Sequence, residues 1–260
     1  MSMPVAWALS ILLLFAASCG GSGHRTGQQG LSGNWQLSLQ TDTASESQSG
    51  FLVQNGKAIY GGLQLSGENI SGQTECAGVG TVQGQISNSQ MQMVVVQAGR
   101  TFTLTGAAGS DSTSLSGSYS VLSAGCGQTE IGTWTGVAIP PLTGNFQMTL
   151  ASTQTSSVSH YTGSITQGPN QGRSTTTLSG SMTSADGTCV PNATIAGVIS
   201  GTNVVLNFVG PDGTSVGKLE ATMTTDATSL AGYYRFSNAT TSSCSDLGGA
   251  NMSVLISAGS

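Results

Sequence analysis

Leu31-Ser-Gly-Asn-Trp-Gln-Leu-Ser-Leu39 and Leu142-Thr-Gly-Asn-Phe-Gln-Met-Thr-Leu150 are two copies of one segment within a chain of 260 residues. Asp111-Ser-Thr-Ser-Leu-Ser-Gly-Ser-Tyr119 has a similar partner in Asp226-Ala-Thr-Ser-Leu-Ala-Gly-Tyr-Tyr234. The offset between the copies is 142 − 31 = 111 at the start and 244 − 126 = 118 at the last cysteine. So small a drift indicates a duplicated domain with a few added loop residues. We expect one domain over residues 31–139 and a second over 142–258, joined by a short linker, Pro140-Pro141.

Apolar residues recur at every second position in both copies, and no stretch shows sustained helical spacing. The alternation predicts eight short strands in each copy. In the first copy they span about 33–40, 49–54, 58–66, 79–87, 89–97, 100–107, 113–121 and 130–138. In the second they span about 144–151, 160–166, 174–182, 192–200, 202–210, 216–224, 228–236 and 249–257. We therefore expect an all-β protein of two tandem antiparallel eight-stranded up-and-down barrels, with a pair of β-sandwiches as the alternative.

The connections between these strands place the cysteines. In a meander the odd-numbered connections share one end of the barrel, and three of the four in the first copy (41–48, 67–78 and 122–129) are expected to be long. The other end carries tight turns, beginning with a two-residue hairpin at Asn55-Gly56. Cys76 and Cys126 both fall in the long connections. Because an exported chain favours disulfides, we expect the bonds Cys76–Cys126 and Cys189–Cys244, one within each copy.

Composition excludes several classes of function. The net charge is −5 and only six residues are basic, so no electrostatic footprint for nucleic acid exists. No apolar run after residue 18 is long enough for a membrane-spanning helix. Short strands and an aromatic content of 5% argue against an outer-membrane pore. No Cys-x-x-Cys pair or neighbouring histidine suggests a metal site, and no cofactor motif is expected.

The first 30 residues are typical of an exported protein. Residues 5–17 form an apolar segment followed by small residues, so we expect a signal peptide over residues 1–18. The segment Ala16-Ala17-Ser18-Cys19-Gly20 resembles the lipobox of bacterial lipoproteins, although Ala16 replaces the usual leucine and no basic residue precedes the apolar segment. The resemblance implies that Cys19 is lipidated and that Gly20 directs the protein to the outer membrane. The glycine-rich segment that follows Cys19, up to residue 30, is expected to form a flexible tether. An ordinary signal peptide is the alternative.

Gly33-Asn-Trp35 begins the first copy and is similar to the Gly-x-Trp motif of lipocalins, within the wider group of lipocalin and avidin-like barrels. The resemblance implies that Trp35 plugs the closed end of a barrel opposite the long loops. Phe146 stands at the matching position of the second copy, and the basic residue that packs over the tryptophan in lipocalins has no clear match here. An ordinary core tryptophan is the alternative interpretation.

Few residues suggest chemistry. Gly213-Thr-Ser215-Val-Gly217 matches a Gly-x-Ser-x-Gly nucleophile elbow in form, but it follows Pro211-Asp212 and is better explained as a turn that enters a strand. His160 has no counterpart in the first copy and is expected to be a surface residue. Asp111 and Asp226 match each other and are explained by turn formation. Tyr233 and Arg235 are weak candidates for ligand binding, with Tyr234 expected to face the core instead.

We therefore expect a non-enzymatic, exported, lipid-anchored protein that faces the periplasm or the cell surface and has a binding or surface-interaction role. A small ligand or a surface protein is the expected partner. The alternative is a lipocalin-like carrier of a small apolar or sugar-like ligand, and a hydrolase is a distant third. A filled barrel interior would count against the carrier.

Overall fold

The computed structural model describes residues 30–66, 78–124, 126, 129–186, 190–237 and 245–255. Every regular element in these residues is a β-strand. The first barrel, barrel 1, consists of β1 (Gly33–Gln40), β2 (Ser45–Asn55), β3 (Ala58–Ser66), β4 (Val79–Ser87), β5 (Gln90–Gln97), β6 (Arg100–Ala108), β7 (Ser114–Ser123) and β8 (Glu130–Ile139). The second, barrel 2, consists of β9 (Gly144–Ser152), β10 (Val158–Gln167), β11 (Thr176–Ser184), β12 (Asn192–Ser200), β13 (Asn203–Val209), β14 (Ser215–Met223), β15 (Ser229–Phe236) and β16 (Asp246–Leu255).

Both barrels are closed, which confirms the predicted fold class and excludes the sandwich alternative. Each strand pairs antiparallel with the next one along the chain, and the first strand of each barrel pairs with the eighth. Closure leaves no exposed sheet edge to attract another strand. Strand bounds agree with the sequence expectation to within about four residues, because turn residues and alternation mark them clearly.

Two details of barrel 1 differ from the expectation. Strand β2 begins at Ser45, not at residue 49, so the first connection is short and only two of the four connections at its end are long. The side chains of Glu46 and Gln48 face inward beside Leu39 and Leu37, which extends the alternation with polar residues that an apolar pattern does not reveal. The first hairpin turn lies at Gly56-Lys57, one residue later than expected, and Gly56 supplies the positive φ of 59°.

Alternation along the strands fills each barrel with buried side chains. The six methionines expected as core filler (Met91, Met93, Met148, Met182, Met223 and Met252) are all at most 5% exposed. Trp35 lies early in β1 and its indole N–H donates to the carbonyl of Leu31 at 2.9 Å. This hydrogen bond ties Leu31 to β1 at the end of barrel 1 at which the chain enters.

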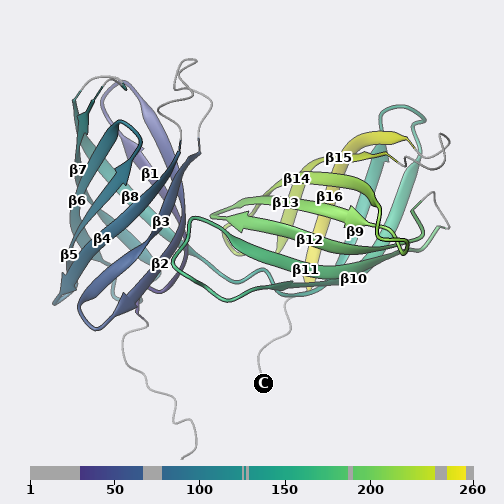
Figure 1. The fold of residues 1–260 in the computed structure, drawn as a ribbon, viewed down its shortest axis with the longest axis horizontal. Helices are drawn as coiled ribbons and strands as arrows, with labels where there is room; N and C mark the ends of the chain where they lie inside the picture. The colour runs from purple at the N-terminus through teal and green to yellow at the C-terminus, as the bar shows by residue number, and fades with distance from the viewer. Residues whose placement is uncertain are drawn as a thin grey trace, which may run out of the picture.

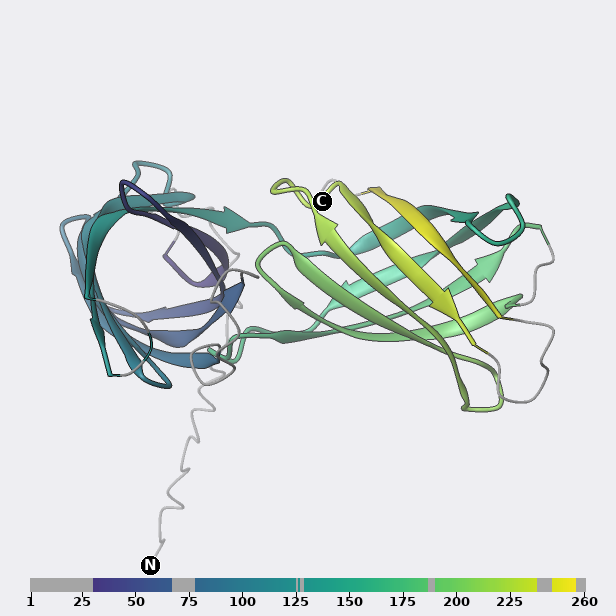
Figure 2. The ribbon, with the colours of Figure 1, turned by 90° about the horizontal axis from the view of Figure 1, so that it is seen from above.

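Each barrel has an entry end, where its first strand begins and its last strand finishes, and an opposite loop end. Barrel 2 lies beside barrel 1 with its entry end against the outer face of β1, β2 and β3 (Figure 1). In Figure 2, barrel 1 is seen along its axis while barrel 2 is seen from the side, so the two barrel axes cross steeply. The entry end of barrel 1 has no barrel against it.

Candidate functional sites

The interior of barrel 1 is occupied by its own side chains. Five residues whose burial bears on the carrier hypothesis belong to one apolar cluster and are at most 5% exposed: Trp35, Leu37, Leu63, Met91 and Phe102. They come from β1, β3, β5 and β6, so they cover different sides of the barrel wall. A barrel of eight strands is wide enough for such side chains to fill it.

The loop end of barrel 2 is closed by aromatic side chains. Phe236 lies 5.2 Å from Tyr234, 5.7 Å from Phe208 and 6.2 Å from Tyr161 between ring centroids, in tilted arrangements. The Tyr234 hydroxyl donates to Asp246 at 2.7 Å, and the Ser152 hydroxyl donates to the same carboxylate at 2.6 Å. Burial and the hydrogen bond to Asp246 raise the pKa of Tyr234 well above its usual range. This end of barrel 2 is thus packed, with its polar groups paired.

The loop end of barrel 1 is crossed by an ion pair. The Arg100 guanidinium on β6 donates to Glu46 on β2 at 2.8 Å, and the Arg100 side chain is 5% exposed. Strands β2 and β6 stand opposite each other in the closed order, so the pair spans the interior. The guanidinium also lies 4.6 Å from the centre of the Phe102 ring, and the Gln48 amide donates to Glu46 at 3.2 Å.

Several polar atoms in this layer have no hydrogen-bond partner among the described residues. They are Gln48 Oε1, both amide atoms of Gln97, and Arg100 Nε. Gln97 is 5% exposed and lies over Gly80, where an added Cβ would stand 2.5 Å from the Gln97 Cγ. Buried polar groups without partners each cost about 1–3 kcal/mol and call for an explanation.

The two copies therefore differ most inside their loop ends. Gly50 faces Trp35 as Gly163 faces Phe146, so Gln48 of barrel 1 is equivalent to Tyr161 of barrel 2. In the same way, Tyr119 faces Gly132 as Tyr234 faces Gly248, so Glu130 is equivalent to Asp246. Aromatic rings fill this layer in barrel 2, whereas amide and charged groups occupy it in barrel 1.

The contact between the barrels is specific and largely polar. Asn34 on β1 makes two hydrogen bonds with Gly201 in the β12–β13 turn: its amide donates to the carbonyl at 2.8 Å and its oxygen accepts from the N–H at 2.7 Å. Gln36 accepts from the N–H of Thr202 at 3.2 Å, and the hydroxyls of Ser49 and Ser200 lie 2.9 Å apart. A Cβ on Gly201 would stand 2.2 Å from Gln36 Oε1, so this turn requires glycine for the close approach.

Phe51 is the apolar anchor of this contact. It points outward from β2, yet it is 1% exposed and belongs to the apolar cluster of barrel 2 together with Leu142, Ile199 and Met223. Its backbone N–H donates to the carbonyl of Arg173, and the Asn170 amide donates to the carbonyl of Leu52 at 2.7 Å. The phenyl ring from the wall of barrel 1 thus completes the core at the entry end of barrel 2.

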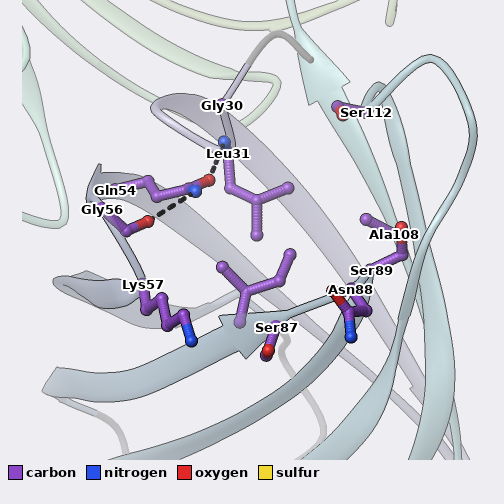
Figure 3. A pocket seen from close by; sticks show the side chains of 11 residues that line it. Gly30, Leu31, Gln54, Gly56, Lys57, Ser87, Asn88, Ser89, Ala108 and Ser112 are labelled. Carbon is purple, nitrogen blue, oxygen red and sulfur yellow. Dashed lines mark hydrogen bonds between the residues drawn. The ribbon is translucent and has the colours of Figure 1, made fainter.

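Among the described residues, no other element covers the matching entry end of barrel 1, and this end is hollow. A pocket of about 390 Å³ lies at this end, and its lining includes Leu31, Ile86, Ala108, Lys57 and Asn88. Figure 3 shows Leu31, Lys57, Asn88 and Ala108 around it. Registers align this lining with the covered end of barrel 2: Ile86 with Ile199, Ser87 with Ser200, Asn88 with Gly201, and Ala108 with Met223. Ser200 is 2% exposed beneath the wall of barrel 1, whereas Ser87 and Asn88 are exposed.

The sequence-predicted binding residues Tyr233 and Arg235 lie on the outer face of barrel 2. Tyr233 is 79% exposed, Arg235 is exposed, and Tyr234 between them faces the core, as expected. Arg235 is the cross-strand neighbour of Lys218, which pairs with Glu220. These side chains line a shallow surface hollow, so the structure keeps Tyr233 and Arg235 together but away from any barrel interior.

The residues that the sequence suggested for catalysis do not come together in the structure. Residues 210–214 form the expected turn, with Gly213 at a φ of 81°, and Ser215 begins strand β14. His160 lies on β10, where its Nδ1 is 3.0 Å from Asp186 and its side chain is 57% exposed. No hydrogen bond joins Ser215 to His160 among the described residues. Asp111 and Asp226 accept from the N–H groups of Thr113 and Thr228, which confirms their role in turns.

The cysteine and membrane predictions are tested little by the described residues. Cys126 is disulfide-bonded. Cys19, Cys76, Cys189 and Cys244 lie outside the described residues, so the two predicted bonds and the lipidation of Cys19 stay predictions. The described residues contain no group of three or more metal-ligating side chains. They also contain no helix long and apolar enough to cross a membrane.

Sequence reasoning missed the inter-barrel contact and the hollow end of barrel 1. One signal was present: Phe51 interrupts the polar outer face of β2, and Ser164 stands at the matching position of the second copy. An apolar residue on an outward position of one copy alone indicates a contact that the other copy lacks.

The structure thus defines a tandem pair of closed, filled β-barrels held together by a specific contact. No protein-family model matches the chain, and no curated protein matches it. Among solved structures, it is similar to the chain described as intact Ap-TbpB with its N and C lobes, at 10% identity and a TM-score of 0.23. The match covers 81% of this chain and 61% of that one, so this chain spans less than two thirds of its neighbour. A likeness of this degree carries no argument about function.

Proposed function

We propose that this is an exported, lipid-anchored, non-enzymatic protein that recognises a partner through the outer surface and ends of its barrels. The observation that carries the proposal is the filled interior. Trp35, Leu37 and Phe102 occupy barrel 1, and the rings around Phe236 occupy barrel 2, which leaves the outer surface for recognition. The molecule already uses one barrel end as a docking surface, because Phe51 is seated in the entry end of barrel 2.

Titration with the fluorescent dye 1-anilinonaphthalene-8-sulfonate tests the filled interior. We expect no saturable rise in fluorescence that a long-chain fatty acid displaces, because such a rise requires an apolar lumen inside a barrel. A saturable rise that a long-chain fatty acid displaces would contradict the proposal and favour a lipocalin-like carrier.

The lipid anchor has a separate test. In a bacterial host, we expect the protein to sediment with outer-membrane vesicles and a Cys19→Ala variant to be released in soluble form. A wild-type protein that is soluble in the periplasm would contradict anchoring without affecting the recognition proposal.

A carrier of a small sugar-like ligand is the second candidate, favoured by the polar layer of barrel 1. Among the described residues, Gln97 has a donor and an acceptor without partners there, Gln48 an acceptor, and Arg100 a donor. Hydroxyl groups can satisfy both kinds of atom.

Gln97→Leu separates this carrier from a filled scaffold. Without a ligand, replacing an unsatisfied buried amide by an apolar group should raise the free energy of unfolding by about 1–2 kcal/mol. With a carrier, a panel of monosaccharides should raise the melting temperature of the wild type and not of Gln97→Leu. We expect the first outcome and no effect of the sugars.

A further inference from the structure

We propose that the entry end of barrel 1 is a docking site for a partner protein that inserts an aromatic side chain flanked by a carboxylate. The proposal deepens the proposed function by naming the surface and the chemistry of the partner. The proposed function and this docking site can fail independently, because the dye titration examines the barrel interiors and the experiment below examines the outer end of barrel 1.

The equivalent end of barrel 2 already holds an aromatic side chain. The matching end of barrel 2 receives the Phe51 ring from an outward position of a β-sheet, with Asn34, Gln36 and Ser49 bonding around it. Both ends are built alike, since Gln54 accepts from the N–H of Leu31 at 2.8 Å and Gln167 accepts from that of Leu142 at 3.0 Å. At the entry end of barrel 2, a β-turn and an apolar floor therefore already accept a phenyl ring.

The hollow at the entry end of barrel 1 has the size and the lining to hold an aromatic side chain. Ala108 stands where barrel 2 has Met223, so its side chain fills less of this end than a methionine does. Ile86 and Ala108 are half-buried and supply the apolar surface of the hollow, whose volume of about 390 Å³ exceeds that of a phenyl ring (Figure 3). Burial of an aromatic side chain in such a place is the usual energetic centre of a protein interface.

The charge of Lys57 favours a partner that carries a carboxylate. Lys57 lies at the rim, is exposed and has no ion-pair partner among the described residues. It is one of six basic residues in a chain of net charge −5, so an unpaired cation beside an apolar hollow is a rare feature here. A carboxylate next to the aromatic group would pair with it.

A second copy of this chain does not fit as the occupant by the geometry seen between the barrels. Ser164 in barrel 2 stands where barrel 1 has Phe51, so the wall of barrel 2 lacks the anchor. Asn88 stands where barrel 2 has Gly201, at which a Cβ would approach Ser49 to 2.6 Å. Both changes block a head-to-tail array built by repeating the internal contact.

Amide chemical-shift titration with blocked dipeptides tests the docking site. With the probe acetyl-Asp-Phe-amide we expect saturable shifts at Leu31, Ser87 and Ser89, with acetyl-Asp-Ala-amide at least tenfold weaker. Lys57→Gln should weaken acetyl-Asp-Phe-amide about threefold and leave acetyl-Asn-Phe-amide unchanged, as expected for an exposed ion pair.

Ala108→Trp is the blocking variant, because its own indole would fill the hollow. It should abolish the shifts, while Thr105→Val on the same strand and Ala108→Met, which copies the end of barrel 2 that holds Phe51, should not. Absence of saturable shifts in the wild type, or shifts that persist in a folded Ala108→Trp variant, would overturn the proposal.

Two further measurements identify other occupants. Sedimentation showing a concentration-dependent dimer that Ala108→Trp disrupts would replace the partner by a second copy. Binding to phosphatidylglycerol vesicles that Lys57→Gln abolishes would replace it by a membrane. Either result would overturn the proposal as stated.

Discussion

Tyr119 and Tyr234 show how one conserved position of the duplicated pattern has been used in two ways. Both tyrosines are buried at 3–4% exposure in the same place of the two barrels. The Tyr234 hydroxyl donates to Asp246, whereas no hydrogen bond of the Tyr119 hydroxyl is found among the described residues. Burial and the nearby carboxylates of Glu130 and Glu46 raise the pKa of Tyr119.

Tyr234→Phe should therefore lower the free energy of unfolding by about 1.5–3 kcal/mol, because a hydrogen bond to a carboxylate is lost. Tyr119→Phe is the matched control and should change it by less than about 0.5 kcal/mol. Urea denaturation of both variants measures the difference. Equal destabilisation by the two substitutions would show that the bond to Asp246 contributes nothing.

The turn at Asp226 in barrel 2 is expected to make the stability of the fold depend on pH. Hydrogen bonds from Thr224 and Thr228 lower the pKa of Asp226 to about 2. Since the folded pKa lies below the unfolded one of about 3.9, its charged form stabilises the fold above pH 4, and this contribution disappears as the pH falls through 2.

Asp226→Asn should accordingly be less stable than the wild type at pH 6, with the gap closing between pH 4 and pH 2. Thermal unfolding at several pH values measures it, with Asp42→Asn in a different turn as the control. A gap that stays constant over this range would contradict the assigned pKa.

At the scale of elements, the strands were predictable from the sequence because alternation and turn residues agree along both copies. The limits of β2 were not, since Glu46 and Gln48 face inward as polar residues and break the apolar pattern. The place of the inter-barrel contact was marked in the sequence by Phe51, but its partners were not: Asn34 and Gln36 look like ordinary outer-face residues until Gly201 and Thr202 are placed against them. The hollow at Ala108 depends on comparing it with Met223 in space.

The ion pair across barrel 1 should stabilise the loop end only as a pair. Arg100→Met leaves Glu46 without its cation in a largely buried place and should cost about 3 kcal/mol. The double variant Glu46→Leu with Arg100→Met should recover most of this loss, because neither charge is then left unpaired. Chemical denaturation of the single and double variants checks it, and a double variant no better than the single would contradict this interpretation.

At the scale of the whole molecule, the contact around Phe51 joins the two barrels, and Phe51 from barrel 1 belongs to the core of barrel 2. Phe51→Ala should lower the free energy of unfolding of barrel 2 by about 3 kcal/mol. It should also split one calorimetric transition into two, whereas Ser164→Ala, at the matching position, should do neither. One unchanged transition in Phe51→Ala would show that the contact does not couple the barrels.

The two equivalent barrel ends differ in use: the wall of barrel 1 occupies the end of barrel 2, whereas no described residue of another element occupies the end of barrel 1. Hydrogen–deuterium exchange at the matching turns tests this most directly. The N–H groups of Gly201 and Thr202 bond to Asn34 and Gln36, so they should exchange at least tenfold more slowly than those of Asn88 and Ser89. This protection should vanish in Phe51→Ala. Equal, fast exchange at both turns of the wild-type protein would contradict the account.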